Sequence, residues 1–381
     1  MMTPMRILIA SGHPYLPQIA GGSQSNTHEM ALELKKHGHD VAVLAGLSGD
    51  GWLALRSRLI MKLGRLKLVR DDMIGYPVFR AWQARDVAAE VVRQWHPDVV
   101  IAQPGSVVAI ALAFKALGVP TVAYFHNVEF EDHGGDISDI TGMPLLANSR
   151  YTAGAYQKEY GVNATVVPPL FQSERYTVER RGDRVLFINP HPLKGVDVAL
   201  DVAARCPDLQ FDFVESWTLS SAQRDHVRDR ARKLGNVTLH GRTSDMRGHY
   251  GRARVVLVPS RWAETWGRVA SEAHYSGIPV IATRIGGLEE AVGPGGILMA
   301  PDADGATWAV ALQDLWNDTS RYSALSERAL TFSQRPEIDR IHQIAQIEVV
   351  LQRAIGHHTA TNKVPRSASK PTNSVSRTGR A

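Results

Sequence analysis

Two glutamates, Glu264 and Glu272, stand with seven residues between them in a segment that can position them for chemistry. The segment reads as a short apolar strand (Val255–Val258), a loop with Glu264, a helix with Glu272 and a second strand (Val280–Ala282). The start of such a helix offers unpaired N–H groups and a positive dipole end, which attract a phosphate. Carboxylates repel phosphate, so the pair should bind neutral hydroxyl groups on either side of it. A hexose and a ribose joined by a diphosphate have that layout.

With Trp266 and Gly267 between them, the two glutamates resemble the E-x7-E signature of retaining glycosyltransferases of family 4, which have the GT-B fold. The blocks SGIPVIAT and GGLEE that follow resemble the next two blocks of that family. Two glutamates at this spacing also occur in ordinary strand–helix–strand units, with both side chains in water. The rest of the chain must therefore favour one reading.

Strands and helices alternate along most of the chain, which predicts an α/β fold with parallel sheets. The resemblance implies two doubly wound, Rossmann-like domains that face each other across a cleft. Pro168-Pro169 reads as the hinge. The expected parts are an N-terminal acceptor-side domain (1–168), a C-terminal nucleotide-sugar-binding domain (169–335), a helix that crosses back to the first domain, as the resemblance implies (336–355), and a disordered basic tail (356–381).

The composition is that of a soluble globular protein: 381 residues, 44% of them hydrophobic and 21% charged. The single cysteine, Cys206, excludes an intrachain disulfide, and we expect a cytoplasmic protein. Residues 356–381 hold five cations and no acid, which equals the whole net charge of +5. The folded body is then formally neutral, which argues against specific nucleic-acid binding.

In the first domain, a glycine loop with Gly21 and Gly22 precedes the first helix and would let a sugar or phosphate approach the backbone. Its spacing is not that of a dinucleotide fingerprint. The block resembles the family's N-terminal block, near the transferred sugar and the acceptor; a flexible turn is the alternative. His126, at a strand end, resembles the family's histidine that contacts the transferred sugar. His13 and Glu129 are weaker candidates for the acceptor side.

In the second domain, Lys194 follows a strand and can donate to a diphosphate. The family usually has an arginine five residues before this lysine; here Asn189 stands there, which keeps a donor but loses the charge. The resemblance implies donor contacts by Gly21, Gly22, Asn189, Lys194, Trp266, Gly267, Arg268, Glu272, Gly287 and Glu290.

For these residues the resemblance implies a retaining hexosyltransferase-type reaction. Glu264 would hold and orient the sugar, Glu272 the ribose, and His126 the sugar from the opposite domain. Lys194 and the backbone amides near Gly267 would stabilise the leaving diphosphate in place of a metal, so we expect neither metal nor cofactor. The acceptor would be a glycan, a lipid-linked molecule or a natural product.

Asp302 and Asp304 match the D-x-D motif of metal-dependent transferases, but they precede a helix and we interpret them as a helix cap.

Two other functions fit the same fold: a nucleotide-sugar epimerase or hydrolase, and a non-catalytic partner subunit. Residues 52–70 read as a basic amphipathic helix, which can lie on the inner face of a membrane or pack on the domain with a solvated edge.

Overall fold

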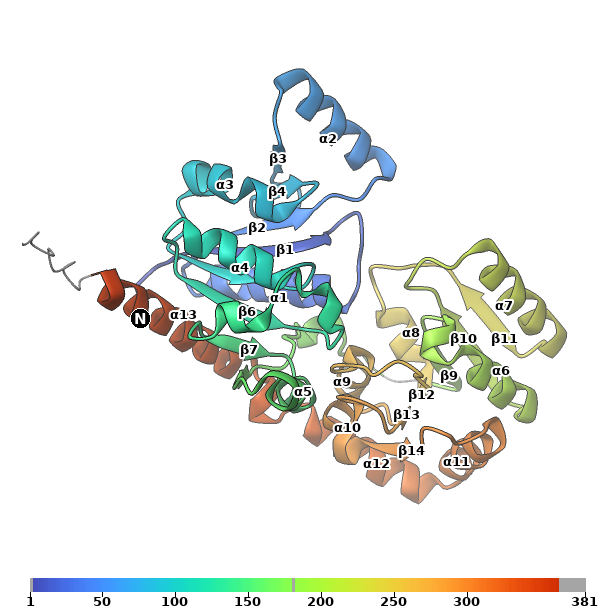
Figure 1. Cartoon of the computed structure of the whole chain (residues 1–381). Coiled ribbons are helices and arrows are strands. Elements are labelled where there is room, and N and C mark those ends of the chain that lie inside the picture. Colours follow the sequence, from blue (N-terminus) through green and yellow to red (C-terminus); the bar gives the residue numbers. More distant parts are fainter. Residues whose placement is uncertain (1–2, 180–181, 363–381) are drawn as a thin grey trace, which may run out of the picture.

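The computed structural model describes residues 3–179 and 182–362 and consists of two α/β domains that lie side by side (Figure 1). The first domain is built on an eight-stranded sheet in the order β3-β4-β2-β1-β5-β6-β7-β8. Neighbouring strands are parallel except for the antiparallel β3–β4 pair. The strands are β1 (Arg6–Pro14), β2 (Asp40–Gly46), β3 (Leu68–Asp71), β4 (Val78–Ala81), β5 (Val99–Ala102), β6 (Thr121–Phe125), β7 (Leu145–Ala147) and β8 (Thr165–Val166).

The helices of the first domain are α1 (Gly22–Lys36), α2 (Gly51–Gly64), α3 (Ala88–Trp95), α4 (Val107–Ala116) and α5 (Arg150–Tyr160). All of them except α2 cover the faces of this sheet. Side chains of α3 and α4 pack on one face, in a cluster with Leu8 and Val100. Side chains of α1 pack on the other face with Ile7 and Ile9. The central strands are buried on both faces, which explains why their sequences are nearly continuous apolar runs.

The second domain has a six-stranded parallel sheet in the order β11-β10-β9-β12-β13-β14. Its strands are β9 (Arg184–Ile188), β10 (Gln210–Val214), β11 (Val237–His240), β12 (Ala253–Val258), β13 (Val280–Thr283) and β14 (Gly296–Met299). Its helices are α6 (Val196–Arg205), α7 (Ser221–Leu234), α8 (Arg247–Arg252), α9 (Arg268–His274), α10 (Leu288–Val292), α11 (Gly305–Asn317) and α12 (Thr319–Phe332). The predicted boundary at residue 168 falls in the connection between the two sheets.

The last helix, α13 (Arg340–Asn362), returns to the first domain, as Figure 1 shows in red. Ile344, Ile347 and Leu351 of this helix join the core on the α1 face. Gln343 also donates to the carbonyl oxygen of Pro168 at 2.8 Å, which ties the helix to the hinge segment. No helix in the two described ranges is long and apolar enough to cross a membrane.

Two predicted boundaries were wrong. The tail was expected to begin at residue 356, but α13 continues to Asn362. The rest of the predicted tail, 363–381, lies outside the described residues. The basic segment 52–70 is not one helix: α2 ends at Gly64, Arg65 takes a left-handed conformation (φ 51°), and the chain enters β3. A left-handed residue ends an α-helix because it turns the backbone away from the helical path.

Candidate active site

Glu264 and Lys194, predicted from distant parts of the sequence, are in contact. Lys194 Nζ lies 2.5 Å from Oε1 of Glu264, and Ser260 Oγ lies 3.0 Å from the same oxygen. The charged side chains are each 15% exposed. β9 and β12 are neighbouring parallel strands, so the loops at their carboxyl ends lie at one edge of the sheet. That edge is where ligands bind in open α/β sheets.

The surroundings of Lys194 fix its backbone. Gly195 has φ 76°, and a Cβ there would lie 1.8 Å from the carbonyl oxygen of Pro259. Only glycine therefore lets the loop after β9 lie against the loop after β12. The ammonium group lies 4.6 Å from the ring centroid of Trp217, within the range of a cation–π contact. The ammonium group of Lys194 thus contacts Glu264 and Trp217. An ammonium group has three N–H donors, so Lys194 can also donate to an anion.

Asn189 makes a contact within the protein that the resemblance did not imply, and the predicted donor contact of its Nδ2 stays a prediction. The residue is buried, with φ 70°, and its Oδ1 accepts a hydrogen bond from the backbone N–H of Trp217 at 3.0 Å. Nearby His191 likewise accepts through Nδ1 from the N–H of Leu193 at 3.2 Å. Both side chains therefore hold loops of the second domain in place. Among the described residues at this strand end, Lys194 carries the positive charge of the predicted phosphate clamp.

Glu272, the second glutamate of the motif, points into the protein. Its Oε2 accepts from the hydroxyl of Tyr250 at 2.8 Å, and Arg268 Nε lies 3.3 Å from its Oε1. Burial raises the pKa of Glu272, although Arg268 and Tyr250 counteract the rise. Both carboxylate oxygens thus have protein partners, which leaves the predicted contact with a ribose without support in this structure.

Arg268 joins Glu272 to the other domain. Its Nη2 lies 3.2 Å from each carboxylate oxygen of Glu29 in α1 and 3.2 Å from the hydroxyl of Tyr176, which also donates to Glu29 at 2.9 Å. Glu29 is 1% exposed. These five residues, Arg268, Glu29, Glu272, Tyr176 and Tyr250, form what we call the Arg268 network. Of these residues, the sequence had singled out Arg268 and Glu272, both as donor contacts.

The paired glycines of the first domain lie beside this network. Gly21 caps the start of α1, and a Cβ on Gly22 would lie 3.4 Å from Cδ of Arg268. The predicted N-terminal glycine block and the E-x7-E segment are therefore close together in space. Gly22 is exposed, whereas Gly21 is partly buried.

Trp266 and Gly287 support the Glu264 loop from inside. The Trp266 ring is buried, and its Nε1 donates to Ser271 Oγ at 3.1 Å. A Cβ on Gly287 would lie 2.3 Å from the carbonyl oxygen of Thr265, so this position requires glycine because the two loops lie close together. Gly267 (φ 92°) is similarly closed off by the side chain of Leu288. These residues shape the loop through packing.

Glu290 also differs from its predicted role. Its Oε2 and Oε1 accept hydrogen bonds from the backbone N–H groups of Arg150 and Tyr151, at 2.9 and 2.7 Å. These are the first residues of α5 in the other domain, where N–H groups lack partners within the helix. Glu290 is thus a cap supplied from one domain to a helix of the other.

His126 meets the Glu264 loop from the first domain. Its carbonyl oxygen accepts from Thr265 Oγ1 at 2.7 Å, and its ring lies 4.0 Å from that of Tyr124. Burial lowers the pKa of His126 to about 3, with a smaller contribution from His13, so the imidazole is neutral. Its Nε2 is buried and has no hydrogen-bond partner among residues 3–179 and 182–362. A buried nitrogen without a partner is available to a ligand.

The two acceptor-side candidates lie near each other, His13 at the end of β1 and Glu129 in the segment after β6. His13 Nε2 is 3.3 Å from Asp132 Oδ2, and Glu129 begins the short turn that contains Asp132. His13 is about two-fifths exposed. The structure thus places both residues in one neighbourhood at the edge of the first sheet, and Asp132 is the partner that links them.

Sequence reasoning missed Asn148 and Thr265, which also join the domains. Asn148 Nδ2 donates to Thr265 Oγ1 at 3.0 Å, and Thr265 in turn donates to His126. Thr265 directly follows Glu264, so its position was a signal. Nothing in the sequence pattern identified Asn148 as the partner of Thr265, or Glu29 as the partner of Arg268.

The structure gathers one group with the atoms of a metal site: Asp212, His240 and His249. Its carboxylate already lies 3.3 Å from Arg184 and 3.2 Å from Arg252, and His240 lies at 2.9 Å. Two guanidinium groups oppose a bound cation, so we assign no metal there. Asp304 caps α11 by accepting from Thr307 at 2.8 Å, as the sequence predicted.

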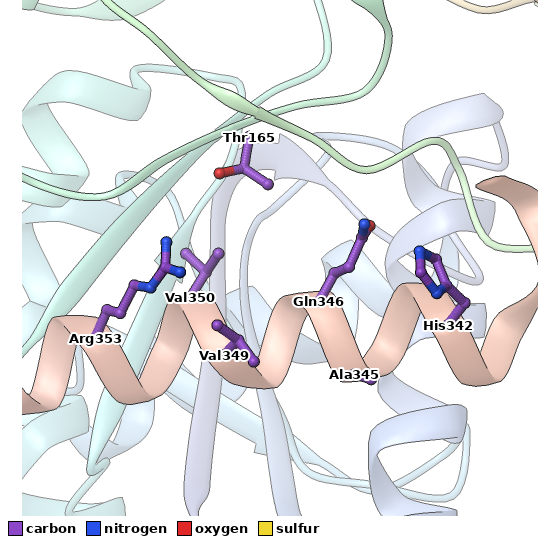
Figure 2. A pocket seen from close by; sticks show the side chains of 7 residues that line it. All are labelled: Thr165, His342, Ala345, Gln346, Val349, Val350 and Arg353. Carbon is purple, nitrogen blue, oxygen red and sulfur yellow. The ribbon is translucent and has the colours of Figure 1, made fainter. Parts of the chain in front are cut away.

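A separate hollow of about 300 Å³ lies between Thr165 and the outer side of α13 (Figure 2). Figure 2 shows Val349, Val350, Gln346 and Arg353 along the helix below Thr165. None of the candidate site residues lines it. We therefore keep it apart from the site described above.

Comparisons with known proteins agree with this architecture. The family models "Glycosyltransferase Family 4" and "Glycosyl transferases group 1" match residues 20–175 and 182–318. D-inositol 3-phosphate glycosyltransferase 1 of Catenulispora acidiphila is 31% identical over 283 residues, which are 61% of this chain and 67% of that protein. The corresponding enzyme of Corynebacterium kroppenstedtii is 42% identical over 93 residues, 24% of this chain and only 20% of that protein.

Among solved structures, Anabaena HepE in complex with UDP and glucose superposes with a TM-score of 0.71 at 20% identity, covering 92% of this chain and 100% of that chain. The two α/β domains and this structural similarity show that the protein has the GT-B fold of glycosyltransferases, which confirms the predicted fold class. With both family models and the Catenulispora relative, the chain belongs to the family 4, group 1 glycosyltransferases.

Proposed function

We propose that this protein transfers a hexosyl group from a nucleoside diphosphate sugar to a hydroxyl group of an acceptor, with retention of anomeric configuration. The observation that carries the proposal is the Lys194–Glu264 contact at the carboxyl edge of the second sheet. An ammonium and a carboxylate side by side suit the two parts of such a donor, because one binds the diphosphate and the other the sugar hydroxyls.

In the proposed reaction, the bond between the sugar C1 and the diphosphate oxygen breaks. The acceptor oxygen forms a bond to C1 on the same face, and its proton passes to the leaving diphosphate. Lys194 would stabilise the charge that develops on the leaving group, which is why we propose that no metal is required. Glu264 would accept hydrogen bonds from the sugar and orient the ring.

His126 would bind the sugar from the first domain. Its imidazole is neutral, so Nε2 can either donate to or accept from a hydroxyl group, depending on the tautomer. The hydrogen bond from Thr265 to the carbonyl oxygen of His126 joins the backbone at His126 to the loop that carries Glu264, which supports this proposal. Donor and acceptor would then meet where the two domains touch, with His13 and Glu129 on the acceptor side.

The test is a thermal-shift panel with UDP, GDP, ADP and TDP on the full chain, with Lys194→Ala beside the wild type. A ligand at one hundred times its Kd stabilises a protein by about 2.7 kcal/mol, which gives a measurable shift in Tm. We expect one diphosphate to raise Tm and Lys194→Ala to remove most of that shift. Lys233→Ala, an exposed lysine of α7, is the matched control and should keep it.

No shift with any diphosphate would contradict the donor site and favour a non-catalytic partner subunit. If a diphosphate binds, the sugar donor with that base is tested next, with and without chelator. Release of free or epimerised sugar at full rate without an acceptor would instead indicate a hydrolase or an epimerase. Loss of turnover with EDTA, restored by a divalent metal, would refute the metal-independent mechanism.

A further inference from the structure

The helix α2 exposes a row of large apolar side chains. Trp52, Leu55, Leu59 and Leu63 lie three or four residues apart, so they share one face of the helix. Trp52 is 74% exposed and Leu63 is 76% exposed. Leu66, just beyond the helix, extends the row and is also exposed. A contiguous apolar patch of this kind on a protein surface usually marks an interaction site.

The opposite face of α2 already has its packing partners. Leu53, Ala54, Ser57 and Met61 are buried, and Met61 belongs to a small cluster with Leu47 and Val69. The helix therefore already buries one face against the domain, and the exposed row is a second, separate face. In Figure 1 the helix stands away from the body of the first domain, at the end remote from α13.

Positive charge accompanies this row. The residues from 51 to 70 contain no acid, and Arg56, Lys62, Arg65 and Lys67 are all exposed. Arg56 flanks the row on one side and Lys62 on the other, as the spacing of a helix requires. Arg58 is partly engaged, since it donates to the carbonyl oxygen of Gly49 at 2.8 Å.

These charges decide between the possible occupants. A second copy that packed α2 against α2 would bring cations against cations, because such a contact uses the same patch on both subunits. An anionic bilayer offers acyl chains to the apolar row and negative headgroups to the flanking cations. The face has the composition of a helix that lies in a membrane interface.

The position of α2 links this face to the candidate site. Gln18, in the loop between β1 and α1, accepts from the backbone N–H of Ser48 at 3.2 Å and donates to its carbonyl oxygen at 3.3 Å. Ser48 lies three residues before α2. The same β1–α1 loop leads to Gly21 and Gly22. The helix is thus attached to the acceptor side of the protein.

We propose that the exposed face of α2, with Leu66, docks this protein on an anionic lipid surface. The helix lies flat, the apolar row enters the headgroup region, and the cations bind lipid phosphates. This proposal stands apart from the donor site, since no residue of the face contacts Lys194 or Glu264.

The experiment is co-sedimentation of the full chain with vesicles of phosphatidylcholine alone or mixed with phosphatidylglycerol. We expect binding to the anionic vesicles that weakens with salt. Leu59→Glu/Leu63→Glu should lower the partition constant at least about tenfold, the equivalent of roughly 1.4 kcal/mol. Arg56→Gln/Lys62→Gln should weaken binding to anionic vesicles only. Ile341→Glu, an exposed apolar residue of α13, is the matched control and should bind like the wild type.

Absence of wild-type binding to anionic vesicles would overturn the proposal. So would unchanged binding by Leu59→Glu/Leu63→Glu, because basic residues elsewhere in the chain would then be responsible. A wild-type dimer that this variant dissociates, without vesicle binding, would assign the face to a second copy. The nucleotide thermal shift is measured on every variant, so that failure of the lipid proposal and failure of the donor site remain distinguishable.

Discussion

Glu264 and Glu272 belong to one motif, yet the structure places their carboxylates in two different regions. Glu264 lies in a loop at the carboxyl edge of the second sheet, paired with Lys194 and partly open. Glu272 lies inside, between Tyr250 and Arg268, and Arg268 continues to Glu29 of the other domain. We propose that the first glutamate binds the donor, whereas the second contacts the arginine that joins the two domains.

The cause of this difference is local geometry. Residue 264 precedes the helix, where a loop side chain can face the edge that binds ligands. Arg268 and Glu272 are four residues apart within α9, so they share one face of the helix, and here that face is buried. A spacing in sequence therefore does not assign the same role to both members of a pair.

The largest expected effect comes from breaking the buried region. Arg268→Met leaves the buried Glu272 without its cation and leaves Glu29 with only the longer contact to Arg175, 3.6 Å from its Oε1. We expect a loss of roughly 3–5 kcal/mol in the free energy of unfolding. Urea denaturation measures it. Arg284→Met, which breaks an exposed ion pair with Glu289 in the same domain, is the control and should cost no more than about 1 kcal/mol. Equal losses in both variants would mean that the Arg268 network is no more than a surface contact.

The next effect concerns the open region. Glu264→Gln keeps the size of the side chain but removes the charge beside Lys194, and we expect turnover to fall by roughly a hundredfold or more. The measurement is release of the diphosphate from the donor that the nucleotide panel identifies. Glu289→Gln, an exposed glutamate of the same domain, should retain turnover. A Glu264→Gln variant with wild-type turnover would exclude this carboxylate from the reaction.

Much of the architecture could be predicted because its signals are local. Apolar runs separated by helical segments indicate parallel sheets, and Lys194 and Glu264 each follow such a run. The structure shows that the two runs are neighbouring strands. The contacts that redirect Asn189, Glu272 and Glu290 depend on which side chains arrive from elsewhere. Tyr250 lies 22 positions before Glu272, and Glu29 lies in another domain. Periodicity carries no information about such partners.

The same reason explains the errors at boundaries. Residues 356–362 have a composition typical of a disordered segment, yet they continue a helix whose earlier turns pack on the first domain. Tertiary packing of one stretch can extend helix into residues that would not form it alone. Arg65 shows the opposite case, since a residue that suits a helix takes a left-handed conformation and ends α2.

The smallest expected effect tests whether the second glutamate is structural. Burial raises the pKa of Glu272, so the folded protein holds the proton at pH values where the unfolded chain has released it. The free energy of unfolding therefore falls as the pH rises above the pKa that Glu272 has in the unfolded chain. Glu272→Gln stays neutral, and its Tm relative to wild type should increase between pH 4.5 and pH 8, by about one or two degrees.

Glu327→Gln, on an exposed face of α12, is the control and should show a constant difference from wild type over that range. Donor affinity separates the two roles of Glu272. A structural carboxylate predicts that Glu272→Gln changes Tm with pH while the nucleotide-induced shift is nearly kept. If Glu272 instead binds the ribose, Glu272→Gln should reduce the nucleotide-induced shift in Tm. The amide lacks the charged acceptor for the ribose hydroxyls, so the diphosphate would bind more weakly.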